Sequence, residues 1–152
     1  MNHIRQMEER DVSRVAEILV FNNRINFFPI FQCEEYSFGE LQVVSLAKEY
    51  LADPERTRET YVYDDGIVRG MIHIKGMEIV KLFVDPFFQN RGIGDKLLQF
   101  AIEQHKVTHL WALEKNERAI RFYQRHGFRV TDEKVFEEDT IEYLVKLVRD
   151  RK

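Results

Sequence analysis

The hydrophobic pattern changes its period along the chain, and each change marks a change of secondary structure. Between residues 12 and 51, apolar side chains recur every three to four positions, which predicts two amphipathic helices. Asp11 is the expected N-cap of the first helix, and Ser37 with Glu40 three residues later forms a capping box that is expected to open the second. An aromatic-rich connection, broken at Pro29, is expected between them.

After residue 58 the period shortens to two. The stretches ETYVY, IVRGMIHIK and MEIVKLFV alternate apolar and polar residues, and the turn DDG and Gly76 separate them. This pattern predicts three successive antiparallel strands.

Two further helix–strand alternations and a hairpin complete the pattern. A helix is expected over residues 93–102, a strand at THLWAL, and a short helix from Asn116 to Gly127, before the hairpin strands FRVTDEKVF and IEYLVKLV. With a short first strand at residues 2–7, the order is β-α-α-β-β-β-α-β-α-β-β. It predicts an α/β (α+β) fold with a mixed, mostly antiparallel sheet of about seven strands and helices on both faces.

Composition limits the class of protein. The 152 residues are 44% hydrophobic and 32% charged, as expected for one globular domain over residues 1–152. A net charge of −3 predicts no nucleic-acid or membrane partner, and residues 1–6 do not begin a signal peptide. Cys33 is the only cysteine, and a helix-to-strand change is expected between His105 and His109. We therefore expect a cytoplasmic protein without disulfides or a metal site.

The stretch QNRGIGDKLL, at residues 89–98, is the first candidate binding site. The start of a helix carries unpaired N–H groups and a partial positive charge, which suit an anion. Gly92 and Gly94 would let a phosphate approach the backbone, and Arg91 and Lys96 would add positive charge. Taken alone, the same residues are equally compatible with a glycine-containing turn that binds nothing.

Two motifs resemble those of one family. VDPFFQNRGIGDKLL is similar to the acetyl-CoA-binding motif Q/R-x-x-G-x-G/A of the GNAT superfamily of N-acetyltransferases. NERAIRFYQRHGFRV is similar to the family pattern N-x-x-A-x-x-F-Y-x-x-x-G-F. The residues that match are Gln89, Gly92 and Gly94 in the first motif, and Asn116, Ala119, Phe122, Tyr123, Gly127 and Phe128 in the second. The detailed resemblance covers residues 78–130, and the first part of the chain agrees in element order only.

The resemblance implies a GNAT-like fold that binds acetyl-CoA. It implies that backbone groups of Leu82, Phe83 and Val84 hold the pantetheine arm, and that Asn116 hydrogen-bonds it, although Asn116 also fits a plain helix cap. The pyrophosphate would lie at the loop and first helical turn, formed by Asn90, Arg91, Gly92, Ile93, Gly94 and Asp95. Asp95 departs from this pattern because a carboxylate repels phosphate, so we expect it to point away.

Acyl transfer from a thioester to an amine needs a neutral amine, a polarised carbonyl and a proton for the thiolate. Backbone N–H groups near Phe83 and Val84 are expected to polarise the carbonyl. The resemblance makes Tyr123 the general acid, and the alternative is that Tyr123 packs in the core. It makes Glu78 the candidate base, and strand alternation is expected to place Glu78 on one face with Val80, Leu82 and Val84. The alternative for Glu78 is a solvated glutamate, and His73 and Glu114 are weaker candidates for the base.

The resemblance implies an N-acetyltransferase that moves acetyl from acetyl-CoA to a primary amine by direct transfer in a ternary complex. The alternatives are a non-catalytic acyl-CoA sensor and a transferase for a longer acyl-CoA. The acceptor is a small molecule or a peptide, and a monomer and a homodimer remain open. A group of aromatic and acidic residues predicts an acceptor pocket for a cationic amine. The aromatic residues also fit core packing, and the acidic residues also fit a solvated surface. The group consists of Phe27, Phe28, Phe31, Tyr36, Phe38, Glu34, Glu35, Glu137, Glu138 and Asp139.

Overall fold

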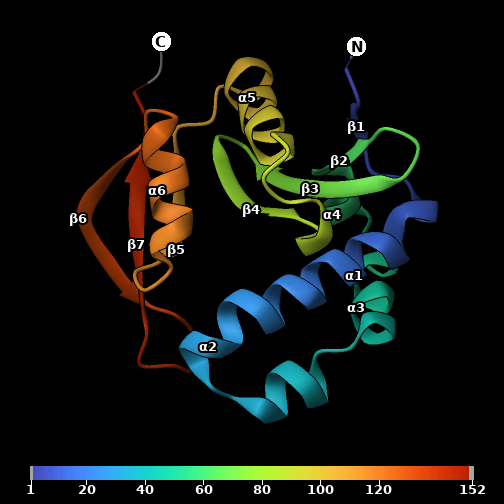
Figure 1. The fold of residues 1–152 in the computed structure, drawn as a ribbon, viewed down its shortest axis with the longest axis horizontal. Helices are drawn as coiled ribbons and strands as arrows, with labels where there is room; N and C mark the ends of the chain where they lie inside the picture. Colours follow the sequence, from blue (N-terminus) through green and yellow to red (C-terminus); the bar gives the residue numbers. More distant parts are fainter. Residues whose placement is uncertain (1, 151–152) are drawn as a thin grey trace.

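The computed structural model describes residues 2–150, which form a seven-stranded sheet in the order β1-β2-β3-β4-β5-β7-β6 (Figure 1). Every neighbouring pair is antiparallel except β4 and β5, which are parallel. The strands are β1 Ile4–Gln6, β2 Thr60–Asp64, β3 Val68–Lys75, β4 Glu78–Val84, β5 His109–Leu113, β6 Arg129–Phe136 and β7 Tyr143–Val148. The expected mixed, mostly antiparallel sheet of seven strands is confirmed.

Helices cover both faces of this sheet. The α-helices are α1 Val12–Asn22, α2 Phe28–Phe31, α3 Val43–Leu51, α4 Pro54–Arg58, α5 Ile93–His105 and α6 Glu117–Arg125. Shorter helical segments are the 3₁₀ turns η1 Glu9–Asp11 and η4 Pro86–Phe88, and the π-helical segments η2 Asn23–Phe27 and η3 Glu35–Glu40. Figure 1 shows α1 and α5 on opposite sides of β3 and β4.

The alternation of β3 explains the two layers of helices. Met71 packs in one core with Val15 and Ile18 of α1, and its neighbour Ile72 packs in a second core with Leu97 of α5. All five side chains are fully buried. Because successive strand residues point to opposite faces, one short strand fixes a helix on each side, and each buried side chain contributes roughly 1.5–3 kcal/mol.

The β4–β5 pair opens toward the carboxyl ends of its strands. The two strands pair only through Glu78 with His109 and Ile79 with Leu110. Beyond these positions β5 pairs with β7 alone. The edge of β4 that faces β5 therefore has no strand neighbour from Lys81 to Val84.

A β-bulge changes the face on which the first residues of β4 lie. The β3–β4 register passes from His73 opposite Lys81 to Ile74 opposite Ile79, so Val80 is an extra residue. An extra residue inverts the alternation of side chains on either side of it.

The expectation that Glu78 and Val80 share a face with Leu82 and Val84 is therefore wrong. Ile79, Leu82 and Val84 contact the same core, the one covered by α5. Glu78, next to Ile79, points to the other face, which α1 covers in part.

The segment between α1 and α3 differs from the sequence-based expectation. Ser37 does not cap a helix, because its buried hydroxyl donates to Asn23 Oδ1 at 2.9 Å, and α3 begins only after Gln42. Pro29 does not break the helix: it lies in the first turn of α2, where proline is tolerated, directly after the π-helical segment η2. The helical path ends instead at Gln32, whose φ is 53°.

The N-cap of α1 also differs from the sequence-based expectation. Asp11 holds the N-cap position without a side-chain capping bond to α1. Its carboxylate accepts instead from the Arg5 guanidinium at 2.7 and 2.8 Å and from the Glu8 N–H at 2.8 Å. An ion pair with Arg5 and a capping box in η1 take the place of the expected cap of α1.

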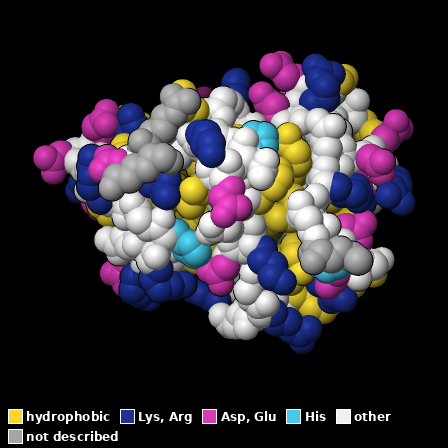
Figure 2. Space-filling view, turned by 90° about the horizontal axis from the view of Figure 1, so that it is seen from above, with side chains coloured by type: hydrophobic (Ala, Val, Ile, Leu, Met, Phe, Trp, Pro, Cys, Tyr) yellow, Lys and Arg dark blue, Asp and Glu magenta, His cyan; other side chains and the backbone are white. Residues whose placement is uncertain are grey.

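The surface carries charges of both signs. On the face shown in Figure 2, lysine and arginine side chains are interspersed with aspartate and glutamate. Within residues 2–150, no helix combines the length and the apolar character that a membrane span requires.

Candidate active site

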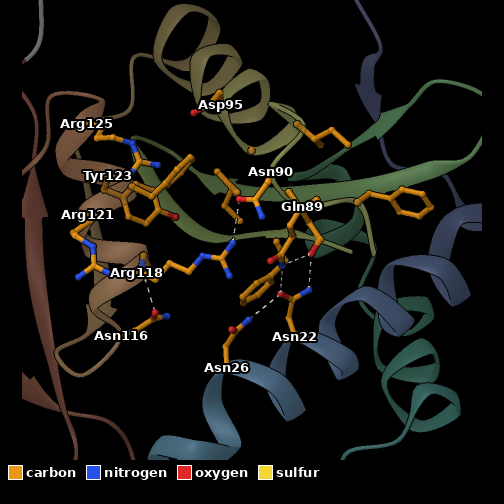
Figure 3. A pocket seen from close by; sticks show the side chains of 18 of the residues that line it. Asn22, Asn26, Gln89, Asn90, Asp95, Asn116, Arg118, Arg121, Tyr123 and Arg125 are labelled. Atoms are coloured by element: carbon orange, nitrogen blue, oxygen red, sulfur yellow. Dashed lines mark hydrogen bonds between the residues drawn. The ribbon is translucent and has the colours of Figure 1, made fainter. Parts of the chain in front are cut away.

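A pocket of about 520 Å³ lies at the opening between β4 and β5 (Figure 3). Its walls come from the end of β4, the following loop, the first turn of α5, one face of α6, and the end of α1 with η2. Of the residues expected at the site, it brings together Leu82, Phe83, Val84, Gln89, Asn90, Gly92, Ile93, Gly94, Asp95, Asn116 and Tyr123. Arg91 and Glu78 are not in the lining.

The free edge of β4 presents backbone polar groups to this pocket. The Asp85 N–H donates to the Arg69 carbonyl at 2.9 Å, so this pair is hydrogen-bonded across β3 and β4. In an antiparallel ladder the next pair points its N–H and C=O outward, and the outward positions recur every second residue. The backbone groups of Leu82 and Val84 therefore face away from β3, where an extended ligand can add like a strand.

One of these groups is already engaged. The Val84 carbonyl accepts from Asn22 Nδ2 at 3.0 Å and from Gln89 Nε2 at 3.1 Å. Figure 3 shows both amides converging on the end of β4. The Leu82 N–H and C=O and the Val84 N–H remain as the groups at this edge that can bind a ligand.

The loop before α5 places a helix N-terminus in the pocket. Asn90 and Gly92 have φ values of 64° and 81°, so the chain turns sharply there. The first helical hydrogen bond runs from the Lys96 N–H to the Gly92 carbonyl at 3.1 Å. The N–H groups of Ile93, Gly94 and Asp95 therefore have no helical acceptor and carry partial positive charge, which fits a phosphate.

The side chain of Asp95 turns away from this anion site, as expected. Its Oδ1 lies 2.7 Å from His126 Nε2 at the end of α6. Figure 3 shows the Asp95 side chain on the side of α5 that faces α6. It is the only carboxylate in the lining of the pocket.

Tyr123 and Asn116 come from α6. Tyr123 is 7% exposed, its ring packs edge-on against Phe122 and Phe128, and its oxygen points into the pocket (Figure 3). Burial raises the pKa of the Tyr123 hydroxyl, so it stays protonated and has a proton available for a hydrogen bond. Asn116 Oδ1 accepts from the Ala119 N–H at 3.3 Å, so its capping role is confirmed. Its contact with pantetheine stays a prediction.

The sequence did not lead us to expect three arginines of α6 in the pocket. Arg118, Arg121 and Arg125 line the pocket, and their spacing of three and four residues puts them on one helical face. Arg118 Nη2 donates to Asn90 Oδ1 at 3.4 Å, which joins α6 to the loop before α5. Their periodicity within the second motif is the signal that could have identified them.

The polar residues of α1 and η2 were also missed. Beside Phe27, an aromatic residue expected at the acceptor pocket, Asn22 and Asn26 line the pocket although they precede Val84 by about sixty residues. No local sequence signal marks them, because only the packing of α1 on β4 brings them there.

The candidate bases lie outside the lining. Glu78 Oε1 is 3.8 Å from His109 Nε2, on the face of β4 opposite Leu82. His73 Nε2 is 2.9 Å from Glu59 Oε1, and Glu114 is paired with Lys134 on the surface. Over the described part of the chain, no group of three or more His, Cys, Asp or Glu residues could hold a metal ion.

Comparison with known proteins agrees with this geometry. The family model described as an acetyltransferase (GNAT) domain matches residues 56–130. The peptidyl-lysine N-acetyltransferase YiaC of Escherichia coli (strain K12) is 37% identical over 70 residues, which cover 45% of this chain and 48% of YiaC. The chain thus spans about half the length of this curated relative.

Solved structures match over almost the whole chain. The solution structure of apo YjaB from Escherichia coli has a TM-score of 0.76 and 21% identity, and covers 98% of this chain and 97% of YjaB. The PaiA N-acetyltransferase of Thermoplasma acidophilum, in complex with coenzyme A, has a TM-score of 0.67 and 19% identity, with coverage of 94% and 96%. These likenesses establish the fold. The family match over residues 56–130 and the identity to YiaC show that this segment, which holds most of the pocket, belongs to the GNAT acetyltransferase superfamily.

Proposed function

We propose that this protein transfers an acetyl group from acetyl-CoA directly to a primary amine in a ternary complex. One observation carries the proposal: a free strand edge, a helix N-terminus with unpaired N–H groups and a buried tyrosine hydroxyl meet in one pocket. These features suit, in turn, an amide-containing arm, a pyrophosphate and a leaving thiolate.

Acetyl-CoA fits the groups of the pocket. Leu82 and Val84 would pair with the pantetheine amides, and the N–H groups of Ile93, Gly94 and Asp95 would bind the pyrophosphate. The two positive φ values at Asn90 and Gly92 open the backbone for this contact. Arg118, Arg121 and Arg125 would supply positive charge to the phosphates.

Bound acetyl-CoA supplies a thioester, whose carbon the amine attacks as the C–S bond breaks. The Val84 N–H would stabilise the negative charge that develops on the carbonyl oxygen. The Tyr123 hydroxyl would donate to the departing sulfur. A thiol titrates near ~8.5 and a phenol near ~10. Because burial raises the pKa of Tyr123 further, we expect it to donate a hydrogen bond as charge grows on sulfur, with proton transfer late in the step.

The amine must lose a proton before it attacks. The one carboxylate of the lining, Asp95, is engaged by His126. Glu78 remains the candidate base, on the face of β4 opposite Leu82 and Val84. Glu78 lies six residues before Val84, roughly 20 Å along β4, so an amine at the thioester would pass its proton to Glu78 only through a chain of several waters.

For the acceptor we propose a lysine side chain of a peptide. The relatives YiaC and YjaB of Escherichia coli are named peptidyl-lysine N-acetyltransferases. Acidic residues on this side of the chain would attract a lysine. Partial burial, followed by the nearby charges of Glu49, Glu40 and Glu137, raises the pKa of Tyr36.

The test is thiol release from acetyl-CoA with a panel of acceptors at matched salt: lysine peptides, polyamines, aryl-alkyl amines and aminoglycosides. We expect turnover with lysine peptides. Binding of CoA by calorimetry without turnover of any amine would favour a sensor, and faster release from propionyl- or butyryl-CoA would favour a longer acyl donor. Best turnover with anionic amines would contradict the acidic acceptor surface and leave acetyl transfer standing.

A further inference from the structure

Asn22 joins the helix on one side of the pocket to the strand on the other. It is the last residue of α1 and is 2% exposed. Its amide nitrogen donates to the Ile18 carbonyl at 2.9 Å and to the Val84 carbonyl at 3.0 Å. A buried amide costs free energy unless it is hydrogen-bonded, so this side chain is held where both acceptors are satisfied.

The π-helical segment η2 begins directly after Asn22 and shapes this corner. A π-helical turn is wider than an α-helical turn, and such turns are frequent at functional sites. Here Asn22, Asn26 and Phe27 all line the pocket. Asn26 Nδ2 donates to Asn22 Oδ1 at 3.1 Å, which fixes the amide with its oxygen toward Asn26 and its nitrogen toward Val84.

The end of β4 needs such support, because it has a strand neighbour on one side only. β3 holds that side, where the Asp85 N–H donates to the Arg69 carbonyl. On the open side, the amides of Asn22 and Gln89 close on the Val84 carbonyl. The peptide group between Val84 and Asp85 is thus held from both edges.

We propose that Asn22 is a positioning residue for acyl transfer: by holding the peptide group that follows Val84, it keeps the end of β4 extended, so that the Val84 N–H, one peptide group earlier, stays directed at the thioester carbonyl. This inference rests on the proposed function. Asn22 acts through Val84 and takes no part in bond breaking.

The expected size of the effect follows from the geometry that the reaction needs. A donor to a developing oxyanion must lie within about 2.7–3.1 Å, and losing one such donor costs about 10²–10³ in kcat. Losing the support of the donor costs less, because Gln89 still holds the Val84 carbonyl. We expect a fall in kcat of about ten- to a hundredfold.

The experiment compares three variants on the full chain with the best lysine peptide. Asn22→Leu keeps the branched shape and the number of side-chain heavy atoms and removes both donors, and Asn22→Ser tests the same loss without added apolar bulk. Ser37→Ala is the matched control, because Ser37 is also 2% exposed and bonds to the same π-helical segment but does not line the pocket. Values of kcat are taken per folded protein, with thermal midpoints measured alongside.

We expect both Asn22 variants to lose kcat while the KM for acetyl-CoA stays within about threefold. Ser37→Ala should lose thermal stability and keep kcat. Unchanged kcat in whichever Asn22 variant folds, or an equal loss in Ser37→Ala, would overturn the proposal.

A binding readout separates this inference from the proposed function. The amide resonance of Val84, followed by ¹⁵N NMR during titration with CoA, should shift in the wild-type protein and shift less in Asn22→Ser. If no amine is turned over but this difference persists, the proposed function fails and the support of Val84 by Asn22 stands. If the wild-type protein turns over and the two titrations agree, the positioning role of Asn22 is wrong.

Discussion

His126 Nε2 lies 2.7 Å from Asp95 Oδ1 and so joins the end of α6 to the first turn of α5 at the rim of the pocket. His126 is further held by its contact with the Phe122 ring, at 5.1 Å between ring centres. The carboxylate nearest the unpaired N–H groups of α5 is therefore directed away from the place where a phosphate would bind.

This pair predicts a coupled effect on CoA binding. His126→Ala frees the Asp95 carboxylate and should weaken binding about two- to fivefold, because a charge at a helix terminus contributes roughly 0.3–1 kcal/mol. Asp95→Asn should strengthen binding slightly, and His126→Ala in the Asp95→Asn background should have almost no effect. Calorimetry at low salt measures the CoA affinity of the wild type, the two single variants and the double variant. An equal loss in both backgrounds would mean that His126 acts by packing on Phe122.

Gly92 and Gly94 should respond differently to substitution. At Gly92 φ is 81°, where a side chain costs about 1–2 kcal/mol, so Gly92→Val should lower the thermal midpoint and weaken CoA binding at least tenfold. At Gly94 an added Cβ would meet Phe122 at 3.5 Å and Val84 at 3.7 Å, which is ordinary contact. Gly94→Ala should therefore bind within about threefold of the wild type, whereas the bulkier Gly94→Val should block the approach of the ligand. Equal affinity in Gly92→Val and wild type, by calorimetry, would contradict the phosphate site.

The parts of the fold that could be predicted depend on contacts within a few residues. The end of α6 is one example. Gly127 has a φ of 90°, and the Phe128 N–H donates back to the Tyr123 carbonyl at 3.1 Å, as the GF pair after a helix indicates. The pocket follows from the two motifs because each places its residues by the local geometry of one helix start.

The features that could not be predicted depend on contacts between distant segments. The bulge at Val80 is set by the register with β3, and it alone decides that Glu78 faces away from Leu82. Ser37 looks like a helix cap in sequence, but its hydroxyl bonds to Asn23, fourteen residues earlier. A hydrogen-bonding side chain does not reveal in sequence which of its available partners it will find.

Lys81 on β4 should make stability rise with pH. Burial and, secondarily, the nearby Arg56 lower its pKa to about 8 from 10.5, against the opposing charge of Glu49. Between pH 8 and 10.5 the unfolded chain binds more protons than the folded chain, so the free energy of unfolding increases with pH across that window. Below pH 8 the folded protein bears the full destabilisation of burying the charged Lys81. Lys81→Met should raise the free energy of unfolding at pH 7 by up to about 3 kcal/mol.

Urea unfolding at pH 7, 9 and 10.5 measures this effect, and the gain in Lys81→Met should shrink as pH rises. Lys75→Met is the matched control, because Lys75 is an exposed lysine on the neighbouring strand. It should change stability by less than about 0.5 kcal/mol. A gain in Lys81→Met that does not depend on pH would show that packing, and not the buried charge, is responsible.

Tyr123→Phe should separate the chemistry of the hydroxyl from the packing of the ring. The ring is held between Phe122 and Phe128, and phenylalanine keeps those contacts, so the thermal midpoint should change little. Removal of the donor to the departing sulfur should lower kcat roughly ten- to a thousandfold, with the KM for acetyl-CoA almost unchanged. Because burial raises the pKa of Tyr123, its ionisation should not cause a fall in wild-type kcat below pH ~10. With an acetyl thioester of a more acidic thiol, which leaves more easily, removal of the Tyr123 hydroxyl should lower kcat less. Equal kcat in Tyr123→Phe and wild type, with a verified acceptor, would make Tyr123 a packing residue.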